Sequence, residues 1–329
     1  MPPVSSQQTP RVALLGAGPM ARAYGHVLRE LGADTVVVGR GEASAGAFRD
    51  EVGLDVLAGG LEANTQALAG CTHAVVALPV PALSGVSQRL VELGVPKLLV
   101  EKPAGLDAGE VDGLARAAKD RGADVFVAYN RRFYASVQEA KRRIAADGGA
   151  TSFRFEISEW AERIAASPNT DAVKRAWFLA NSTHVVDMAF FLGGAPATLH
   201  ARVAGELAWH SPSVFAGCGE SENGALFSYH GDWGAAPRWM VEICTPGHTY
   251  MFQPLEGLKV RTAQGFGVEE VELDDDADTR FKPGVLRQTE AFLAPEPSPD
   301  LLRIEDHARK VREVYAPMVH GTGQGTGRS

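Results

Sequence analysis

The sequence predicts an α/β protein of two domains, in which a doubly wound parallel sheet is followed by an α+β domain with a mostly antiparallel open sheet. Three observations predict this. Short apolar runs alternate with helix-like stretches of about 10 residues in the first part of the chain. A glycine-rich turn joins the first run to the first helix. Beyond residue 150, the run 152–160 alternates between apolar and polar residues, which is typical of a strand with one buried face, and further strand-like runs follow without a strong helix between them.

The glycine-rich turn follows the apolar run 12–15, which predicts a buried strand. Gly16, Gly18 and Ala21 fit the pattern G-x-G-x-x-A, and a helical pattern follows. Gly16 permits a tight turn, Gly18 lets the backbone approach a pyrophosphate, and Ala21 lets the helix pack close to the strand. The helix N-terminus offers free N–H groups to the phosphates. Five residues of this turn are therefore predicted to bind a dinucleotide: Gly16, Ala17, Gly18, Pro19 and Met20.

The rest of the first domain continues the alternation of strands and helices. We expect strands at 34–39, 72–78, 96–101 and 124–129. We expect helices at 42–51, 61–68, 81–93 and from Asp107 onward. The pattern predicts a dinucleotide-binding domain over residues 10–130.

The second domain is expected over residues 131–320, with substrate-binding and oligomerisation roles. A helix at 133–146 precedes a strand at 152–160, whose residues Phe153, Phe155 and Ile157 share one face. Further strands are expected at 198–203, 224–229, 239–243 and 258–261, and closing helices at 284–293 and 304–315. Residues 1–9 and 321–329 are expected to be disordered tails.

Composition narrows the classes of function. The chain has 329 residues and a net charge of −8, and no basic block stands out, so nucleic acid is not an expected partner. No apolar stretch approaches the ~18 residues of a membrane span, and the N-terminus lacks the apolar core of a signal peptide. Three scattered cysteines lack metal-ligand spacing, so no metal site is expected. A cytoplasmic protein with reduced thiols is predicted.

Two stretches at strand ends contain candidate catalytic or substrate-binding residues. Glu101-Lys102-Pro103 ends one of the parallel strands, where ligands bind in open α/β sheets, and Lys102 there can reach a substrate hydroxyl. The alternative is an ordinary surface lysine. Asn130 and Arg131 follow the last such strand and are candidate substrate residues, with a hinge bearing exposed arginines as the alternative.

A third stretch, residues 181–193, predicts a helix capped by Asn181 or Ser182. His184 then lies in the first turn, where the helix dipole disfavours the imidazolium, so a neutral ring able to accept a proton is expected. Asp187 lies three residues further along and could orient that ring. The alternative is a packed histidine, with Asp187 serving the helix dipole.

Together these stretches resemble the glucose-fructose oxidoreductase/inositol dehydrogenase/MocA family of oxidoreductases. The resemblance extends from Val12 to about Tyr315 and rests on five motifs: Gly16-Ala-Gly18-Pro-Met-Ala21, Leu78-Pro79, Glu101-Lys102-Pro103, Asn130-Arg-Arg132-Phe133 and His184-x-x-Asp187. It implies a Rossmann domain, an open-sheet domain that often forms dimers or tetramers, and NAD(P)-dependent chemistry on sugars and polyols. It also implies catalytic roles for Lys102 and His184, cofactor contacts at Leu78, Pro79, Glu101 and Lys102, and a cis Lys102–Pro103 bond.

Two positions depart from the family pattern. Many members carry an aspartate four residues before the histidine, where this chain has Ala180, so a carboxylate relay through that position is absent. Many NAD-using members end the second strand with an acidic residue, where this chain has Gly39-Arg40. Arg40 could pair with a 2′-phosphate or stack on adenine, so the cofactor could be NAD or NADP.

These residues predict an oxidoreductase that moves hydride between a sugar hydroxyl or ketone and a nicotinamide. His184 takes the hydroxyl proton and Lys102 stabilises the developing alkoxide, or the two roles are reversed. A non-catalytic NAD(P)-binding sugar sensor, or a reductase of imines or tetrapyrroles, is the alternative. A homodimer or homotetramer is expected, with a small sugar as the ligand.

The substrate prediction rests on Trp160 and the glutamates around it, Glu156, Glu159 and Glu162. An indole stacks on sugar rings, and carboxylates bind hydroxyl or ammonium groups. The net charge of −8 favours a cationic ligand over a sugar nucleotide. An amino sugar or aminoglycoside-like saccharide is therefore expected, as in some antibiotic-pathway members of the family, with a solvated strand face as the alternative. The predicted substrate residues are Asn130, Arg131, Trp160, Trp177, Asn181 and His184.

Overall fold

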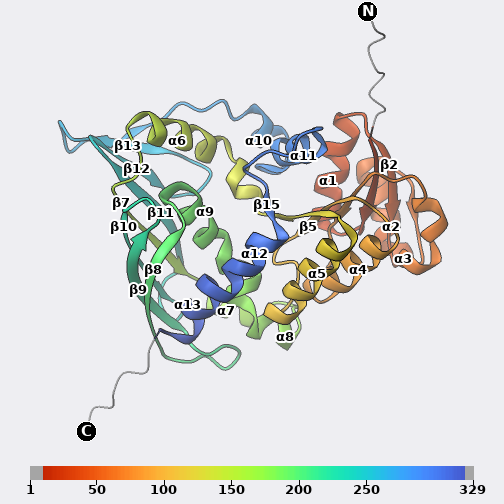
Figure 1. Ribbon diagram of the computed structural model, residues 1–329, viewed down its shortest axis with the longest axis horizontal. Coiled ribbons are helices and arrows are strands. Elements are labelled where there is room, and N and C mark those ends of the chain that lie inside the picture. The colour runs from red at the N-terminus through yellow and green to blue at the C-terminus, as the bar shows by residue number, and fades with distance from the viewer. Residues whose placement is uncertain (1–9, 323–329) are drawn as a thin grey trace, which may run out of the picture. The chain divides into compact units, whose positions relative to one another are not determined.

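The computed structural model describes residues 10–322, which form two compact units (Figure 1). Unit 1 comprises residues 10–105, 109–128 and 285–305, and unit 2 comprises 106–108, 129–284 and 306–322. Each predicted domain was one continuous stretch of sequence. In the structure, unit 1 also includes residues 285–305. Tyr129 and Asn130, which were predicted to end the first domain, belong to unit 2. The predicted tail 1–9, and that beyond Thr322, lie outside the described residues.

Unit 1 holds the predicted parallel sheet, with seven strands in the order β15-β6-β5-β4-β1-β2-β3. Six strands are parallel and β15 is antiparallel to β6. Two-residue strands β3 and β15 were not predicted. The strands are β1 (Arg11–Leu15), β2 (Asp34–Val38), β3 (Val56–Leu57), β4 (His73–Val76), β5 (Lys97–Glu101), β6 (Asp124–Ala128) and β15 (Leu302–Arg303).

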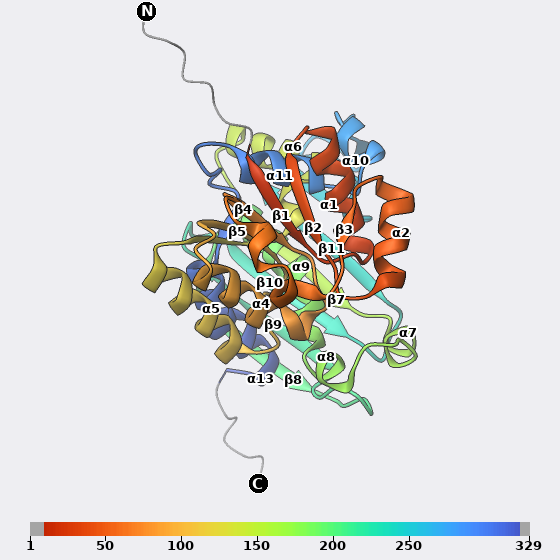
Figure 2. The ribbon, with the colours of Figure 1, turned by 90° about the vertical axis from the view of Figure 1, so that its right-hand side faces the viewer.

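Helices cover both faces of this sheet, with α1 and α2 on one side and α4 and α5 on the other (Figure 2). This double cover explains why the interior strand β1 is a continuous apolar run, since Val12, Ala13 and Leu14 are fully buried. The helices are α1 (Pro19–Glu30), α2 (Glu42–Val52), α3 (Gly60–Ala63), α4 (Val80–Glu92), α5 (Ala108–Arg121) and α11 (Val285–Leu293).

The helix predicted at 61–68 is two short pieces, α3 and a 3₁₀ turn, η1 (Thr65–Leu68). Asn64 lies at the break. Its Nδ2 donates to the carbonyl oxygens of Ala58 and Gly60, each at 2.8 Å. Asparagine side chains compete with helical hydrogen bonds in this way, and the competition ends α3.

Unit 2 holds an eight-stranded sheet in the order β14-β13-β12-β11-β7-β10-β9-β8. All neighbours are antiparallel except the parallel pair β7 and β10, which confirms a mostly antiparallel sheet. The strands are β7 (Ser152–Ser158), β8 (Pro196–Ala204), β9 (Val214–Ser221), β10 (Leu226–Asp232), β11 (Arg238–Thr245), β12 (His248–Phe252), β13 (Lys259–Thr262) and β14 (Glu269–Glu270).

One face of this sheet packs against helix α9 (Thr183–Gly193), and the predicted apolar face of β7 lies there. Phe153, Phe155 and Ile157 are each at most 3% exposed. The Phe153 ring stacks on Phe227 at 5.3 Å and meets Phe190 of α9 edge-on at 5.8 Å. Burying side chains of this size stabilises the fold by roughly 1.5–3 kcal/mol each.

The remaining helices of unit 2 are η2 (Asn130–Phe133), α6 (Ala135–Ala146), α7 (Ala161–Ala165), α8 (Asp171–Arg175), η3 (Phe178–Ser182), α10 (Asp276–Arg280), α12 (Ile304–Lys310), η4 (Val311–Tyr315) and α13 (Ala316–His320). Of these helices, η2, η3 and α6 contact α9. The closing helix continues five residues past its predicted end. Thr322 still pairs with β8, its N–H donating to the Ala201 carbonyl at 3.0 Å. Among the helices of residues 10–322, none is long and apolar enough to cross a membrane.

Candidate functional site

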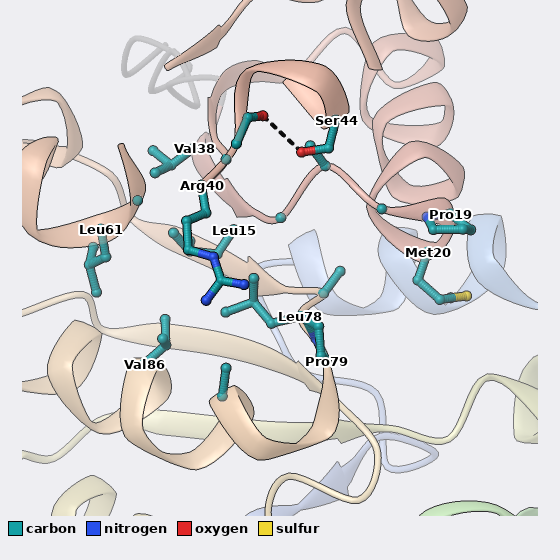
Figure 3. Close-up of a pocket in the computed structure, with 18 of the residues that line it drawn as sticks. Leu15, Pro19, Met20, Val38, Arg40, Ser44, Leu61, Leu78, Pro79 and Val86 are labelled. Carbon is teal, nitrogen blue, oxygen red and sulfur yellow. Dashed lines mark hydrogen bonds between the residues drawn. The ribbon is translucent and has the colours of Figure 1, made fainter. Parts of the chain in front are cut away.

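A cavity of about 1040 Å³ opens at the glycine-rich turn of unit 1 (Figure 3). This is at the upper end of the range for cofactor sites. Eight of the ten predicted cofactor residues line it: Gly16, Ala17, Gly18, Pro19, Met20, Arg40, Leu78 and Pro79. Glu101 and Lys102, the other two, are not among its lining residues.

The two glycines of the turn have different structural roles. Gly16 has a φ of +124°, and a Cβ there would lie 2.3 Å from the Ala77 carbonyl oxygen. Gly18 has an ordinary φ of −80°, and a Cβ there would meet nothing within 4 Å. Gly16 is thus required by the turn itself, whereas Gly18 leaves room inside the cavity. Gly18 also precedes α1, whose first turn has no side-chain cap and no acidic residue, so its amides suit an anion.

The opposite part of the cavity follows β2, where Arg40, Gly41 and Ser44 line it. Helix α2 begins at Glu42, and Ser44 Oγ donates to the Gly41 carbonyl at 2.9 Å. The Arg40 side chain extends across the cavity toward Leu78 (Figure 3). None of the residues that line this cavity in the described chain is acidic. A cation beside a helix N-terminus suits a phosphate better than a sugar hydroxyl.

Lys102 follows β5, and its bond to Pro103 is cis, which confirms the prediction. The neighbouring Glu101 is 9% exposed and accepts a hydrogen bond from the Tyr24 hydroxyl of α1 at 3.0 Å. Burial and the Glu101 charge hold the pKa of Tyr24 well above its usual value, so Tyr24 stays a donor. Glu101 therefore ties the end of β5 to α1, and this contact fixes the strand end from which Lys102 emerges.

His184 lies in unit 2, in the first turn of α9, but that helix does not start as predicted. A π-helical turn, η3, runs directly into it, and Ser182 has helical φ and ψ of −64° and −24° without a side-chain cap. The Thr183 N–H already bonds to the Phe178 carbonyl. The predicted cap by Asn181 or Ser182 is therefore wrong. His184 therefore does not lie at a free helix N-terminus, because helical hydrogen bonding continues from η3 into α9.

Asn181 and Ser182, the two predicted capping residues, donate hydrogen bonds to a buried carboxylate instead. Glu159 follows β7, is 3% exposed, and accepts a hydrogen bond from Ser182 Oγ at 2.6 Å. Asn181 Nδ2 lies 3.3 Å from the same oxygen. The sequence placed Glu159 near a substrate, and nothing in the pattern indicated that it anchors the turn before His184.

Tyr129 packs against His184 within unit 2. The two rings meet edge-on with centroids 5.9 Å apart. The Tyr129 hydroxyl donates to Thr183 Oγ1 at 3.1 Å, and Thr183 Oγ1 donates to the Leu179 carbonyl at 2.8 Å. Burial and nearby Asp187 raise the pKa of Tyr129, so its hydroxyl keeps its proton. Tyr129 and Thr183 therefore hold His184 against the preceding π-helical turn.

Asp187 has a different role from the one predicted. It is 1% exposed, and its carboxylate oxygens accept from Arg132 Nε and Nη2, each at 2.7 Å, and from Lys310 Nζ at 2.8 Å. The two cations outweigh burial and hold the pKa of Asp187 well below its usual range. Asp187 thus pairs with one buried and one half-buried cation. The sequence did not indicate that Lys310 is a partner of Asp187, because 123 positions separate the two residues.

The other predicted substrate residues have defined contacts within unit 2. Asn130 is buried and donates to the Pro283 carbonyl at 2.9 Å. The Arg131 guanidinium lies over the Trp239 ring at 4.8 Å. Trp177 is half-buried and precedes η3. Trp160 is 61% exposed, so it is not a core residue.

Trp160 lines a cavity of about 350 Å³ together with Glu159, Glu162, Arg163 and Trp233. The Arg163 guanidinium lies 6.0 Å from the Trp160 ring. Glu156, which the sequence grouped with these residues, bonds to Ser158 at 3.1 Å and pairs with Arg238 at 3.4 Å.

One protein-family model matches part of the chain. Residues 11–105 match the family model described as NADP oxidoreductase coenzyme F420-dependent. This match covers the part of unit 1 that contains the glycine-rich turn and the cavity. No curated protein matches the chain by sequence.

Solved structures resemble the whole chain in fold. A levoglucosan dehydrogenase in complex with NADH and L-sorbose is 19% identical, with 94% of this chain and 95% of that chain covered and a TM-score of 0.75. The UDP-N-acetylglucosamine 3-dehydrogenase from Acidithiobacillus ferrooxidans is 16% identical, with 94% and 96% covered and a TM-score of 0.72. An oxidoreductase from Agrobacterium radiobacter, in complex with NAD+, L-tartaric acid and magnesium, is 17% identical, with 92% and 93% covered and a TM-score of 0.75. The chain therefore has the fold of a Rossmann domain joined to an open-sheet domain, as predicted.

Within residues 10–322, no group of three or more His, Cys, Asp or Glu side chains could hold a metal ion.

Proposed function

We propose that this protein is an NAD(P)-dependent oxidoreductase that interconverts a secondary hydroxyl of a sugar or polyol and the matching ketone. The cavity at the glycine-rich turn carries this proposal, because the space above Gly18 and the uncapped N-terminus of α1 fit a pyrophosphate. The family match over residues 11–105 supports a nicotinamide nucleotide. The similar fold of a levoglucosan dehydrogenase and a UDP-N-acetylglucosamine 3-dehydrogenase supports a sugar as the substrate class.

The bound nicotinamide supplies the acceptor or donor of hydride. The chain's own residues handle the proton. We assign His184 as the group that takes the hydroxyl proton during oxidation, in a position fixed by Tyr129 and Thr183. We assign Lys102 as the cation that stabilises negative charge on the substrate oxygen. Both assignments rest on the family resemblance, and the reverse division of roles remains the alternative.

NADP is the cofactor that the cavity favours. An acidic residue usually binds the ribose 2′-hydroxyl of NAD, whereas an arginine accommodates the 2′-phosphate of NADP. Here the position after β2 holds Arg40, with Ser44 beside it. The first turn of α2 contains Glu42, but neither Glu42 nor any other acidic residue lines the cavity in the described chain. We therefore propose that NADP(H) binds more tightly than NAD(H).

A neutral sugar or polyol is the substrate that unit 2 favours over an amino sugar. Of the three glutamates grouped with Trp160, Glu156 pairs with Arg238 and Glu159 bonds to Ser182. The Arg163 side chain adds a positive charge beside Trp160. Two of the three carboxylates that could select an ammonium group are thus already paired with other side chains.

We also propose that the protein forms a homodimer or homotetramer through the open sheet.

Gly18→Val should abolish measurable binding of NAD(P) while the protein stays folded. The added side chain enters open space at an ordinary φ, so the turn is not strained, but it occupies the room that a pyrophosphate needs. Isothermal titration with NADP+ and NAD+ measures the loss. Gly16→Ala is the matched control, since its Cβ would meet the Ala77 carbonyl at 2.3 Å and should lower the melting temperature instead. Wild-type affinity in Gly18→Val would refute the cofactor site.

Arg40→Ala should weaken NADP+ binding by about tenfold or more and leave NAD+ binding within about twofold, because only NADP+ carries the 2′-phosphate that a charge-assisted hydrogen bond to Arg40 would recognise. Titration of both nucleotides against wild type and variant gives the two ratios. Equal weakening for both nucleotides would assign Arg40 to adenine stacking.

A further inference from the structure

A third cavity, of about 530 Å³, lies wholly within unit 2. Two π-helical turns, η3 and η4, contact each other beside it, and these are the two π-helical segments of residues 10–322. Phe178 and Leu179 of η3 and Val311 and Tyr315 of η4 line the cavity. π-Helical turns are strained insertions that often mark functional sites, and η3 leads directly into His184.

Most of the residues that line this cavity are apolar. Besides the four residues of the π-helical turns, Leu106, Ala172, Ala176, Ala316 and Val319 line it. Such a surface, in a cavity of this volume, suits the apolar body of a small ligand.

Five titratable residues face the cavity: Asp107, Arg175, His210, Tyr315 and His320. His210 Nδ1 donates to the Pro212 carbonyl at 2.7 Å, and burial lowers the pKa of His210, so this ring is neutral. Burial raises the pKa of Tyr315, so it is neutral too. Asp107 directly precedes α5 and already has an interaction partner in the protein. Arg175 is exposed at the end of α8 and has no ion pair within residues 10–322.

Contacts of the lining residues reach His184. The Leu179 carbonyl accepts the Thr183 hydroxyl at 2.8 Å, and Thr183 accepts the Tyr129 hydroxyl at 3.1 Å. Tyr129 packs edge-on against His184. On the other side, the Tyr315 ring lies 6.1 Å from His307, whose ring lies 5.6 Å from Tyr129. A change in either π-helical turn would therefore alter the packing around His184.

We propose that this cavity is an effector site for a small apolar carboxylate, whose hydrocarbon body packs on the two π-helical turns and whose carboxylate pairs with Arg175. Occupancy fixes η3 and η4 in one arrangement and so shifts the environment of His184. Binding at this site does not depend on the function proposed above. Only an effect of binding on turnover rests on that proposed function.

Octanoate is the probe for the binding half of this proposal, with isothermal titration as the measurement. Arg175→Gln should weaken octanoate binding by about tenfold or more, whereas Lys174→Gln, which changes the neighbouring cation outside the cavity, should leave it within about twofold. Octanol, which lacks the charge, should bind more weakly than octanoate. Ala176→Phe should abolish binding by filling the cavity, with Val319→Phe as the second variant if the first lowers the melting temperature.

Absence of octanoate binding at millimolar concentration would overturn the proposal, as would equal affinity in wild type, Arg175→Gln and Ala176→Phe. Octanol that binds as tightly as octanoate would rule out the carboxylate. A chain shortened after Thr322 should bind octanoate with unchanged affinity. A large gain in affinity would instead make residues 323–329 the occupant.

The coupling half is tested by NMR of protein labelled with ¹⁵N-histidine, without cofactor or turnover. Saturating octanoate should shift the signals of His210, which lines the cavity, and of His184, assigned by its loss in His184→Gln. The signal of the exposed His230 should stay in place. A His184 signal that does not move while His210 shifts would refute the coupling. Because no activity is measured, these results are independent of whether the proposed dehydrogenase function is right.

Discussion

His184→Ala and Lys102→Ala should each lower kcat by roughly two to four orders of magnitude, the usual scale for loss of a proton-transfer group or of a charge that stabilises the transition state. Neither residue lines the nucleotide cavity, so the affinity for NADP+ should change by less than about threefold. Steady-state kinetics with a turned-over sugar, together with titration of NADP+, separates the two effects.

The controls are His200→Ala and Lys119→Ala, which remove the same side chains at exposed positions on β8 and α5 and should leave kcat unchanged. Near-normal turnover in His184→Ala would make His184 a packing residue held by Tyr129. Near-normal turnover in Lys102→Ala would leave the end of β5 without a catalytic role.

Asp187→Ala should lower the free energy of unfolding by about 3–5 kcal/mol, because it leaves the buried Arg132 and the half-buried Lys310 without their shared counter-charge. Urea unfolding monitored by circular dichroism measures the loss. Asp55→Ala, which removes an exposed partner of Arg49, should cost less than about 1 kcal/mol. A loss below about 1 kcal/mol for Asp187→Ala would show that this triad does not stabilise unit 2.

The same triad predicts how stability depends on pH. The pKa of Asp187 is depressed in the folded state, so its contribution is fully present above the unfolded value of about 3.9 and is lost as the pH falls toward the folded value. Wild type should therefore lose stability more steeply below about pH 4 than Asp187→Ala does. Parallel curves for the two proteins would contradict the depressed pKa.

The sheet of unit 1 and its cavity could be predicted because their signals are local. Buried parallel strands are short apolar runs, and the turn at Gly16 and Gly18 has a spacing set by a phosphate-binding helix. In unit 2 the alternation in β7 correctly predicted the face that packs on α9.

Strand β9 was missed for a physical reason. Its glycines lower strand propensity, yet they are needed where aromatic rings of β10 cover the sheet. A Cβ at Gly217 would lie 2.4 Å from the His200 carbonyl oxygen of β8 and 2.5 Å from the Tyr229 ring. One at Gly219 would lie 2.0 Å from the Thr198 carbonyl oxygen and 2.7 Å from the Phe227 ring. Only the cross-strand register brings these residues together.

The surroundings of His184 could not be predicted for a related reason. Ser182 is a good capping residue, but a π-helical turn and a bond to Glu159, 23 residues earlier, give it another partner. Asp187 lies at helical spacing from His184, but Arg132 and Lys310 approach it from distant parts of the chain. Tertiary contacts of this kind override the local rules of helix ends.

The central claim, that this chain is a nicotinamide-dependent dehydrogenase of sugars or polyols, is tested most directly by the absorbance of the reduced cofactor. The protein is incubated with NADP+ or NAD+ and a panel of neutral sugars, polyols and amino sugars, and the reverse reaction is followed with the matching ketones. We predict that reduced cofactor accumulates with at least one neutral sugar or polyol, faster with NADP+ than with NAD+, and fails to accumulate with Gly18→Val or His184→Ala. Tight binding of NADP+ without turnover of any member of the panel in either direction would contradict the account and indicate a cofactor-binding sensor.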